Sequence, residues 1–174
     1  PRPGRLAFRV CGHLRERPVM TCDSKTDRRF DPLLLSNQLC FPLYACSREV
    51  TRSYKSLLER AGLTYTQYVT MMALWEYGEM GVGELGEKLM LDSGTLTPLL
   101  KKLEARRLVT RRRDPDDERR VLVAPTDAGL SLEDELASVP GQMACRINLS
   151  PEEAAELRRL LRKVIAGLEG GRGD

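Results

Sequence analysis

The chain has 174 residues, of which 41% are hydrophobic and 30% are charged, which is enough for one domain of ordinary size with its own core. No run approaches the roughly 20 consecutive apolar residues that a membrane-spanning helix requires, so we expect no membrane partner. The formal net charge is +3, but residues 1–29 carry eight basic and three acidic side chains, leaving 20 basic and 22 acidic residues beyond them. The overall charge therefore does not indicate nucleic-acid binding, which must be argued from local charge placement.

Five cysteines and one histidine limit the metal and disulfide chemistry of the chain. The cysteines (Cys11, Cys22, Cys40, Cys46 and Cys145) form no C-x-x-C pair, and a single histidine removes most zinc-site patterns, so we expect no metal or other cofactor. An odd number of cysteines without the apolar core of a signal peptide argues against a secreted disulfide-bonded protein. We therefore expect a reducing, cytoplasmic location, in which at least one thiol is free to react.

The two ends of the chain lack the periodic apolar pattern of the remainder. Residues 1–29 are rich in Arg, Pro and Gly, which predicts a poorly ordered basic leader, and Met20 is a candidate for the natural start. A transit peptide and a nonspecific nucleic-acid-binding arm are the alternatives for this leader. Residues 169–174 are expected to fray, so one folded domain is predicted for residues 30–168.

Four helices are predicted in the first part of this domain. Asp31-Pro32 offers a cap with proline at the first helical position, apolar residues then recur at helical spacing, and Gly62 is the expected stop. A Thr-x-x-Gln capping box at 64–67 opens the second helix. A short third helix follows Gly81, and the cap-rich run at 92–95 then opens a fourth helix whose leucines recur on one face.

A hairpin and further helices complete the predicted fold. Two β-prone runs, 108–113 and 119–125, are separated by the sequence Asp-Pro-Asp-Asp-Glu, which predicts a β-hairpin with a charged tip. A helix capped by Thr126-Asp127 follows and is expected to break near Pro140-Gly141. A capping box at 150–153, with proline at the first helical position, opens the last helix. The fold class is mainly α with a small β-hairpin.

The segment 82–125 has the order of elements of a winged helix-turn-helix. A recognition helix needs small polar side chains near its N-terminus to contact base edges, and cations nearby for phosphates. Between residues 101 and 120 nine basic residues outnumber five acidic ones, and arginines flank a hairpin tip that is suited to a minor groove. The candidate DNA-binding residues are Ser93, Thr95, Thr97, Lys101, Lys102, Arg112, Arg113, Arg119 and Arg120. The alternative is a structural or protein-docking segment with solvated surface charges.

Cys40 is a candidate for a reactive thiol. If the first helix starts at Ser36, Cys40 lies in its N-terminal region, where unpaired N–H groups and the helix dipole favour a thiolate. Pro42 is expected to break the helix beside this thiol, because proline has no N–H to donate to the carbonyl of Gln38. The alternative for a cysteine on an amphipathic helix is a small buried hydrophobe, which is the expectation for Cys46. Six residues of helix give a net rotation of about 240°, so the two cysteines are not a local disulfide.

Three runs of the sequence are similar to a known family. They are Asn37-Gln38-Leu39-Cys40-Phe41 with Leu43-Tyr44, then Leu63-Thr64-Tyr65-Thr66-Gln67-Tyr68, then Leu91-Asp92-Ser93-Gly94-Thr95-Leu96-Thr97-Pro98-Leu99-Leu100. Over residues 33–168 the chain resembles the organic hydroperoxide resistance regulators of the MarR family. The hairpin tip Asp117-Glu118-Arg119 also resembles the Asp-x-Arg wing feature of MarR proteins, which adds Asp117 to the candidate DNA-binding residues.

The resemblance implies a particular architecture and set of partners. It implies a homodimeric, six-helix winged-helix repressor that binds a double-stranded DNA operator. Residues 64–125 form the DNA-binding lobe in this interpretation, and residues 31–62 and 127–168 supply the dimerisation helices. The expected target is a gene for a thiol-dependent hydroperoxide reductase, by analogy with the family alone.

The resemblance also implies a redox site. Cys40 is the thiol that an organic hydroperoxide oxidises, and three family tyrosines orient it, namely Tyr44, Tyr54 and Tyr65. Ordinary interface packing is the alternative role for these rings. Cys145 lies where two-cysteine members carry a resolving thiol, which implies a Cys40–Cys145 disulfide across the dimer. The alternative is that Cys145 is buried and inert.

Two other functions are weighed against the redox repressor. A MarR regulator relieved by a noncovalent phenolic or lipophilic ligand at the dimer interface keeps its response when Cys40 is replaced by serine. A thiol peroxidase uses the same cysteine pair for catalysis, but it does not require the basic hairpin or the cap-rich helix. We therefore expect a regulator and not an enzyme.

Overall fold

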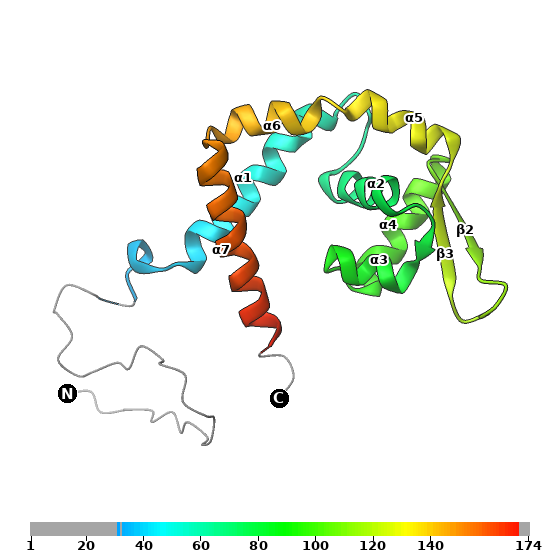
Figure 1. Cartoon of the computed structure of the whole chain (residues 1–174), viewed down its shortest axis with the longest axis horizontal. Coiled ribbons are helices and arrows are strands. Elements are labelled where there is room, and N and C mark those ends of the chain that lie inside the picture. The colour runs from blue at the N-terminus through cyan, green and yellow to red at the C-terminus, as the bar shows by residue number, and fades with distance from the viewer. Residues whose placement is uncertain (1–30, 32, 171–174) are drawn as a thin grey trace, which may run out of the picture. The chain divides into compact units, whose positions relative to one another are not determined.

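Figure 1 shows the computed structural model of the chain, in which residues 31 and 33–170 are described. The chain falls into two units, Pro1–Leu43 and Tyr44–Asp174. The leader expected at 1–29 and most of the tail expected at 169–174 lie outside the described residues.

The first α-helix starts later than the sequence predicts. The Asp31 carboxylate accepts a backbone hydrogen bond of 2.8 Å from two residues further on, but only a 3-10 turn, Leu35–Asn37, follows. Helix α1 runs over Cys40–Leu58, so the starts expected at Asp31 or Ser36 are wrong, and Cys40 is the first helical residue. Pro42 is the third, where a backbone N–H has no intrahelical acceptor, so the break expected beside the thiol does not form.

The second helix begins as the sequence predicts. Helix α2 spans Tyr65–Tyr77, and the Thr64 hydroxyl accepts a hydrogen bond from the Gln67 N–H at 3.3 Å. The Gln67 side chain in turn accepts from the Thr64 N–H at 2.9 Å, so the capping box is complete. Gly62 lies in the preceding turn with φ of +61°, a conformation that favours glycine, although α1 has already ended four residues earlier.

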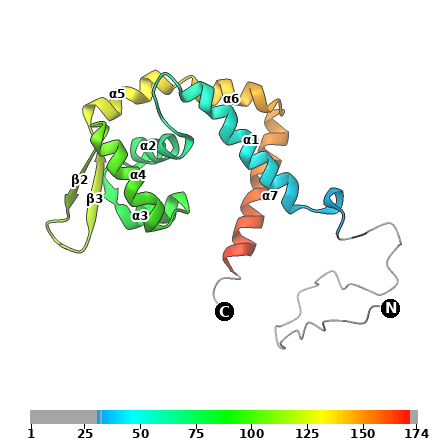
Figure 2. The same ribbon diagram turned by 180° about the vertical axis from the view of Figure 1, so that it is seen from behind.

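The helix-turn-helix is confirmed in α3, Val82–Leu89, and α4, Ser93–Ala105. Both views of the chain show these two helices beside α2, next to the hairpin (Figures 1 and 2). Together with α5 and the sheet they enclose the buried core of the second unit. The largest fully buried side chains of this core are Leu58, Met71, Leu74, Leu85, Leu96, Leu100, Leu103, Val109 and Val123.

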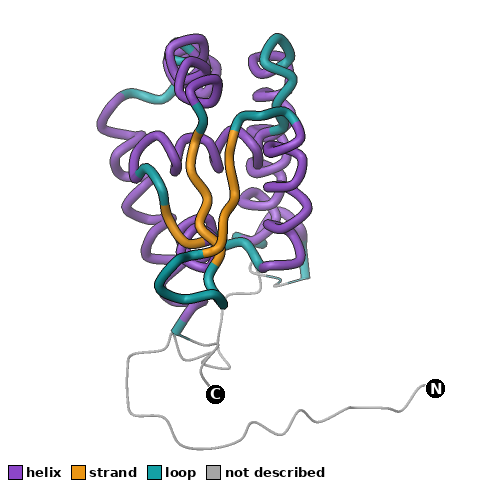
Figure 3. The backbone as a smooth tube through the Cα atoms, turned by 90° about the vertical axis from the view of Figure 1, so that its right-hand side faces the viewer, coloured by secondary structure: helices purple, strands orange, loops and turns teal. Residues whose placement is uncertain are grey.

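The sheet has three strands, one more than the predicted hairpin (Figure 3). Strands β1 (Met80–Gly81), β2 (Val109–Arg113) and β3 (Val121–Pro125) pair antiparallel in the order β1-β3-β2. The sequence does not predict β1 because two residues show no alternation. Strand β3 begins later than expected because Arg119 and Arg120 belong to the tip, where their backbone N–H groups donate to Asp117.

The helix expected after the hairpin is divided into α5, Asp127–Leu136, and α6, Val139–Ile147. The division lies just before Pro140, which confirms the break expected near Pro140-Gly141. Proline lies in the first turn of α6, where its missing N–H leaves no hydrogen bond unmade. Helix α7, Pro151–Glu169, opens with the predicted capping box. The fold class is confirmed, and the six expected helices become seven segments among the described residues.

Gly129 allows α5 to pack directly against the chain that leads into β2. A Cβ atom added at Gly129 meets the carbonyl oxygen of Leu108 at 2.1 Å and the Met71 methyl at 3.1 Å. The Trp75 indole N–H also donates to the Gly129 carbonyl at 2.8 Å. Any side chain at this position therefore forces backbone to move.

We predict that Gly129→Ala lowers the free energy of unfolding by about 2–3 kcal/mol, because the helix must shift away from Leu108. Gly83→Ala is the matched control, since no atom lies within 4 Å of its added Cβ, and we expect a change below about 1 kcal/mol. Urea unfolding at one fixed protein concentration measures both. Equal effects of the two substitutions would contradict the close packing at Gly129.

Candidate nucleic-acid interface and thiol sites

Helix α4 has one buried and one exposed face. Its buried residues are the four leucines at 96, 99, 100 and 103, between 0% and 8% exposed. Ser93, Thr97 and Lys101 follow one another at intervals of four residues, so they form one row, and all three are exposed. The predicted residues Thr95 and Lys102 are also exposed. A helix with hydroxyls near its N-terminus and lysines further along has the donor groups that contact base edges and phosphates.

The N-terminus of α4 is capped by Asp92. One carboxylate oxygen accepts the Thr95 backbone N–H at 2.8 Å, and the other accepts the Thr95 hydroxyl at 3.0 Å. These hydrogen bonds lower the pKa of Asp92 below its ordinary value, and the one from the Thr95 backbone N–H has the larger effect. Thr95 is therefore committed to the cap, whereas Ser93 and Thr97 have no side-chain hydrogen bond among the described residues.

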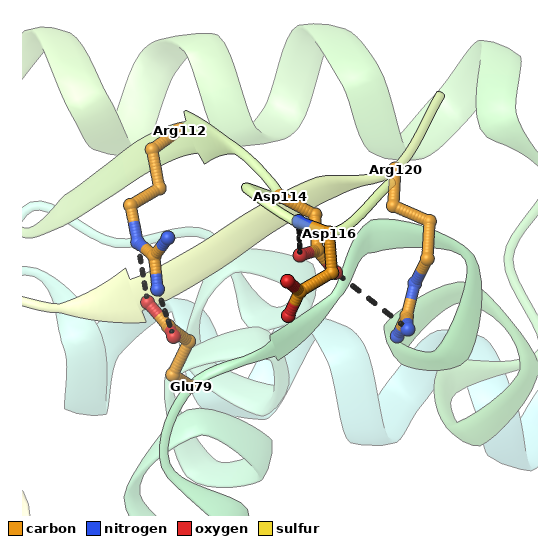
Figure 4. A network of polar contacts seen from close by, with 5 residues as sticks. All are labelled: Glu79, Arg112, Asp114, Asp116 and Arg120. Carbon is orange, nitrogen blue, oxygen red and sulfur yellow. Dashed lines mark hydrogen bonds and ion pairs between the residues drawn. The ribbon is translucent and has the colours of Figure 1, made fainter. Parts of the chain in front are cut away.

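We define the wing as β2, β3 and the tip between them, residues 109–125. Its base is held on both faces by ion pairs from successive residues of β2. Arg111 pairs with Glu104 of α4 through both Nε (2.9 Å) and Nη2. Arg112 pairs with Glu79 through two hydrogen bonds of 3.1 and 2.6 Å, which raise the pKa of the guanidinium (Figure 4).

At the tip of the wing, two further arginines contact other residues of the same chain. Arg120 lies 3.7 Å from the Asp114 carboxylate (Figure 4), and the Arg113 guanidinium donates to the Glu118 carbonyl at 2.6 Å. The Arg119 side chain has no partner in the part of the chain that the structure describes, and it is exposed. Its backbone N–H donates to the Asp117 carboxylate at 3.0 Å, so Asp117 shapes the turn that presents Arg119. Of the four wing arginines predicted to bind DNA, only Arg119 is thus free of a side-chain contact among the described residues.

All three cysteines within the described residues are exposed and free: Cys40, Cys46 and Cys145. Burial was the expectation for Cys46 and is wrong, because α1 buries only Leu58 in this chain. Burial was also the alternative for Cys145, which instead lies exposed in the last turn of α6. The neighbouring Arg146 fixes that turn on α1 by donating to the Ser53 carbonyl (2.8 Å) and the Ser56 hydroxyl (3.0 Å).

Two of the three predicted tyrosines lie together in the second unit. The rings of Tyr54 and Tyr65 are 4.7 Å apart, and Tyr68, which the sequence did not single out, lies 5.8 Å from Tyr54. Burial first, and the neighbouring phenols second, raise the pKa of Tyr54 and of Tyr68, so both keep their protons and remain hydrogen-bond donors. Tyr44 is exposed instead, and its hydroxyl accepts a 3.0 Å hydrogen bond from Arg48.

The described residues show no group of three or more His, Cys, Asp or Glu side chains placed to hold a metal ion. None of the helices in this part of the chain has the length and apolar composition that a membrane span requires.

Comparison with known proteins identifies the family. Residues 52–136 match the family model described as transcriptional regulator SarA/Rot. The chain is also 43% identical over 143 residues to the organic hydroperoxide resistance transcriptional regulator of Bacillus subtilis (strain 168), which covers 82% of this chain and 95% of that relative. The chain belongs to the MarR family of winged-helix transcriptional regulators. The family predicted from the three sequence runs is thereby confirmed.

Solved structures agree with this MarR-family assignment. The structure of reduced AbfR bound to DNA matches with a TM-score of 0.67 and 33% sequence identity, and the match covers 78% of this chain and 93% of that chain. AbfR is a protein of Staphylococcus epidermidis. The structure of a mutant MarR from E. coli complexed with operator DNA matches with a TM-score of 0.67 and 27% sequence identity, and the match covers 72% of this chain and 92% of that chain. This MarR-family chain is therefore a transcriptional regulator and not an enzyme, which removes the thiol peroxidase interpretation.

We predict that Asp92 stabilises the folded state in a pH-dependent way. Its pKa is lowered on folding, so its contribution is complete above the ordinary pKa of 3.8 and is lost as the pH falls below that value. Asp92→Asn keeps an oxygen acceptor but removes the charge, so the difference in stability between wild type and variant shrinks on acidification. Urea unfolding between about pH 6 and pH 3 measures it. A difference that is constant over this range would contradict the role of the charged cap.

Proposed function

We propose that this MarR-family chain is a redox-sensing repressor, which binds a double-stranded DNA operator as a homodimer and leaves it when organic hydroperoxides oxidise Cys40. The carrying observation is the position of that thiol. Cys40 is exposed, free and the first residue of a helix, the end at which backbone N–H groups have no intrahelical acceptor and can donate to a bound peroxide or to the sulfur. The name of the Bacillus subtilis relative supports an organic hydroperoxide as the inducer.

Each α4 enters a major groove in this proposal, with Ser93 and Thr97 at base edges and the lysines at phosphates. The wing reaches the flanking minor groove, where Arg119 is the arginine available for insertion. The similarity to AbfR bound to DNA and to a mutant MarR complexed with operator DNA supports DNA as the partner.

The dimer is proposed to form through residues 31–62 and 127–168. Helix α7 supports this assignment because it buries no residue within its own chain. Its apolar side chains are left exposed, including Leu157 (41%), Leu160 (44%) and Leu168 (68%). A repeated apolar face of this kind on a long helix is typical of a surface that a second chain covers.

The redox switch is proposed to proceed in two steps. The Cys40 thiolate attacks the peroxide O–O bond and takes up one oxygen as a sulfenic acid, while the hydroperoxide is reduced by two electrons and, with a proton, leaves as an alcohol. The Cys145 thiol of the partner subunit then displaces that oxygen as water and forms the intersubunit disulfide. Tyr54 keeps its proton, and we assign it, with Tyr44 and Tyr65, to orient the thiol or the peroxide by hydrogen bonding.

Disulfide formation is proposed to release DNA by joining the start of α1 to α6 of the other subunit. A bond between the sulfurs requires Cα atoms about 4.4–6.8 Å apart, which draws the two helices together. The spacing of the two α4 helices then no longer matches successive major grooves. The target in this proposal is a gene for peroxide detoxification.

A second candidate is relief by a noncovalent phenolic or lipophilic ligand. The observation that favours it is an apolar hollow beside Tyr54, lined also by Met143, Ile147 and Leu149. Its volume is about 210 Å³, below the roughly 300 Å³ at which drug-sized ligand pockets begin. We therefore rank this candidate second.

The test uses a DNA duplex that the reduced wild-type protein selects from a random-sequence pool. We expect stoichiometric cumene hydroperoxide to abolish the gel shift and to give a dimer-sized band on nonreducing electrophoresis. Cys40→Ser is expected to stay bound after oxidation and Cys145→Ser to form no such band, because each lacks one of the two sulfurs. Cys46→Ser is the matched control, since it changes an exposed thiol on the same helix.

Three outcomes separate the candidates. Oxidation that leaves the wild-type protein bound to DNA rejects the redox switch. A phenolic ligand that releases Cys40→Ser as well as wild type supports the noncovalent candidate. A disulfide band that persists without Cys145 but disappears in Cys46→Ser identifies a different resolving thiol.

A further inference from the structure

We infer that Glu79 is a positioning residue for DNA binding, because it holds Arg112 and thereby fixes the direction of the wing. Arg112, which the sequence suggested as a DNA-binding residue, is in this inference a part of the wing's support and not a contact to DNA. The inference rests on the proposed binding of the wing to DNA, and it assigns a role to an acidic residue that the sequence did not single out.

The pair joins strands that are not neighbours in the sheet. Glu79 directly precedes β1, and Arg112 lies on β2, with β3 between the two strands. Arg112 is opposite Leu122 in the register, and Leu122 is opposite Gly81. Glu79 lies two residues before Gly81, so its side chain is on the same face and meets that of Arg112 diagonally across β3 (Figure 4). The contact is two-pronged, with Nε and Nη2 each donating to a different carboxylate oxygen. This geometry fixes the orientation of both side chains as well as their distance.

The neighbouring residue supplies a second support on the other side of the strand. Successive side chains on a strand point to opposite faces, so Arg111 and Arg112 leave β2 in opposite directions. Arg111 reaches Glu104 on α4, whereas Arg112 reaches the segment before β1. The base of the wing is therefore connected to α4 on one face and to the segment between α2 and β1 on the other.

The tip beyond this base carries the arginine that remains available. Arg112 must give up two hydrogen bonds with Glu79 to reach a phosphate, whereas Arg119 gives up none among the described residues. Holding the base of the wing reduces the number of directions in which Arg119 points. A loss of the pair therefore weakens binding by leaving Arg119 less well placed.

Glu79→Gln is expected to change DNA affinity in the direction opposite to that usual for loss of a negative charge. Removing a carboxylate near DNA ordinarily strengthens binding, but here we expect the dimer's binding to weaken by about three- to tenfold, since an exposed pair is worth at most about fivefold in each of the two subunits. Arg112→Gln is expected to weaken binding equally, and the double variant to lose no more than either single one. Fluorescence anisotropy with the duplex selected by the wild-type protein measures the dissociation constants.

Salt dependence distinguishes support of the wing from contact with DNA. Each cation that no longer neutralises DNA charge makes the plot of log K against log salt less steep by about 0.9, so a loss in both subunits amounts to about 1.8. We expect Arg119→Gln to lower the slope, whereas Glu79→Gln and Arg112→Gln keep the wild-type slope. Arg112→Lys keeps the charge but not the two-pronged geometry, so it is expected to behave like Arg112→Gln. Glu118→Gln, on the tip, is the matched control for loss of a negative charge and is expected to bind at least as tightly as wild type.

Two results would overturn the inference: tighter binding by Glu79→Gln, or a reduced slope with Arg112→Gln that Arg112→Lys restores. The second result identifies Arg112 as a DNA contact. An Arg119→Gln variant with unchanged affinity and slope would instead reject the proposed role of the wing itself. Thermal melting of every variant separates these outcomes from unfolding, and the exchanged pair Glu79→Arg with Arg112→Glu is expected to recover affinity.

Discussion

Burial of the leucine face of α4 is the constraint on which the proposed DNA-binding surface depends. Leu96, Leu100 and Leu103 are no more than 1% exposed, and they fix the rotation of the helix about its own axis. That rotation leaves Thr97 and Lys101 beside the buried face and exposed, and Ser93, the first residue of the helix, is exposed as well. The same rotation brings Glu104 to Arg111, so the burial that orients the recognition helix also sets one support of the wing.

The charge of the wing shows why a count of basic residues overstates what a nucleic acid can use. Basic residues outnumber acidic ones between residues 101 and 120. Some of these basic side chains, however, already form ion pairs with acidic side chains of the same chain. Ion pairs near the surface contribute little to stability. Their larger effect is on direction, since a two-pronged contact restricts both partners and leaves Arg119 as the wing arginine without a competing partner among the described residues.

The parts of the fold that the sequence predicts are those with local causes. The capping boxes and the leucine stripe of α4 depend on residues within a turn or two of one another. Strand β1 depends instead on pairing with β3, more than 40 residues further on, and the Glu79–Arg112 pair joins positions 33 apart. The false start at Asp31 has a local cause of a different kind, because an aspartate that accepts a backbone N–H also forms turns.

The three described cysteines are alike in exposure but differ in their positions on the helices. All three cysteines of the described residues are exposed, so exposure does not single out a sensor. Cys46 lies within α1, where backbone N–H groups are already paired, and Cys145 lies in the last turn of α6, the end at which a helix carries partial negative charge. Cys40 alone among them begins a helix, the end that carries partial positive charge and backbone N–H groups without intrahelical acceptors. The helix ends therefore favour Cys40 as the thiol that attacks the peroxide and Cys145 as the one that follows.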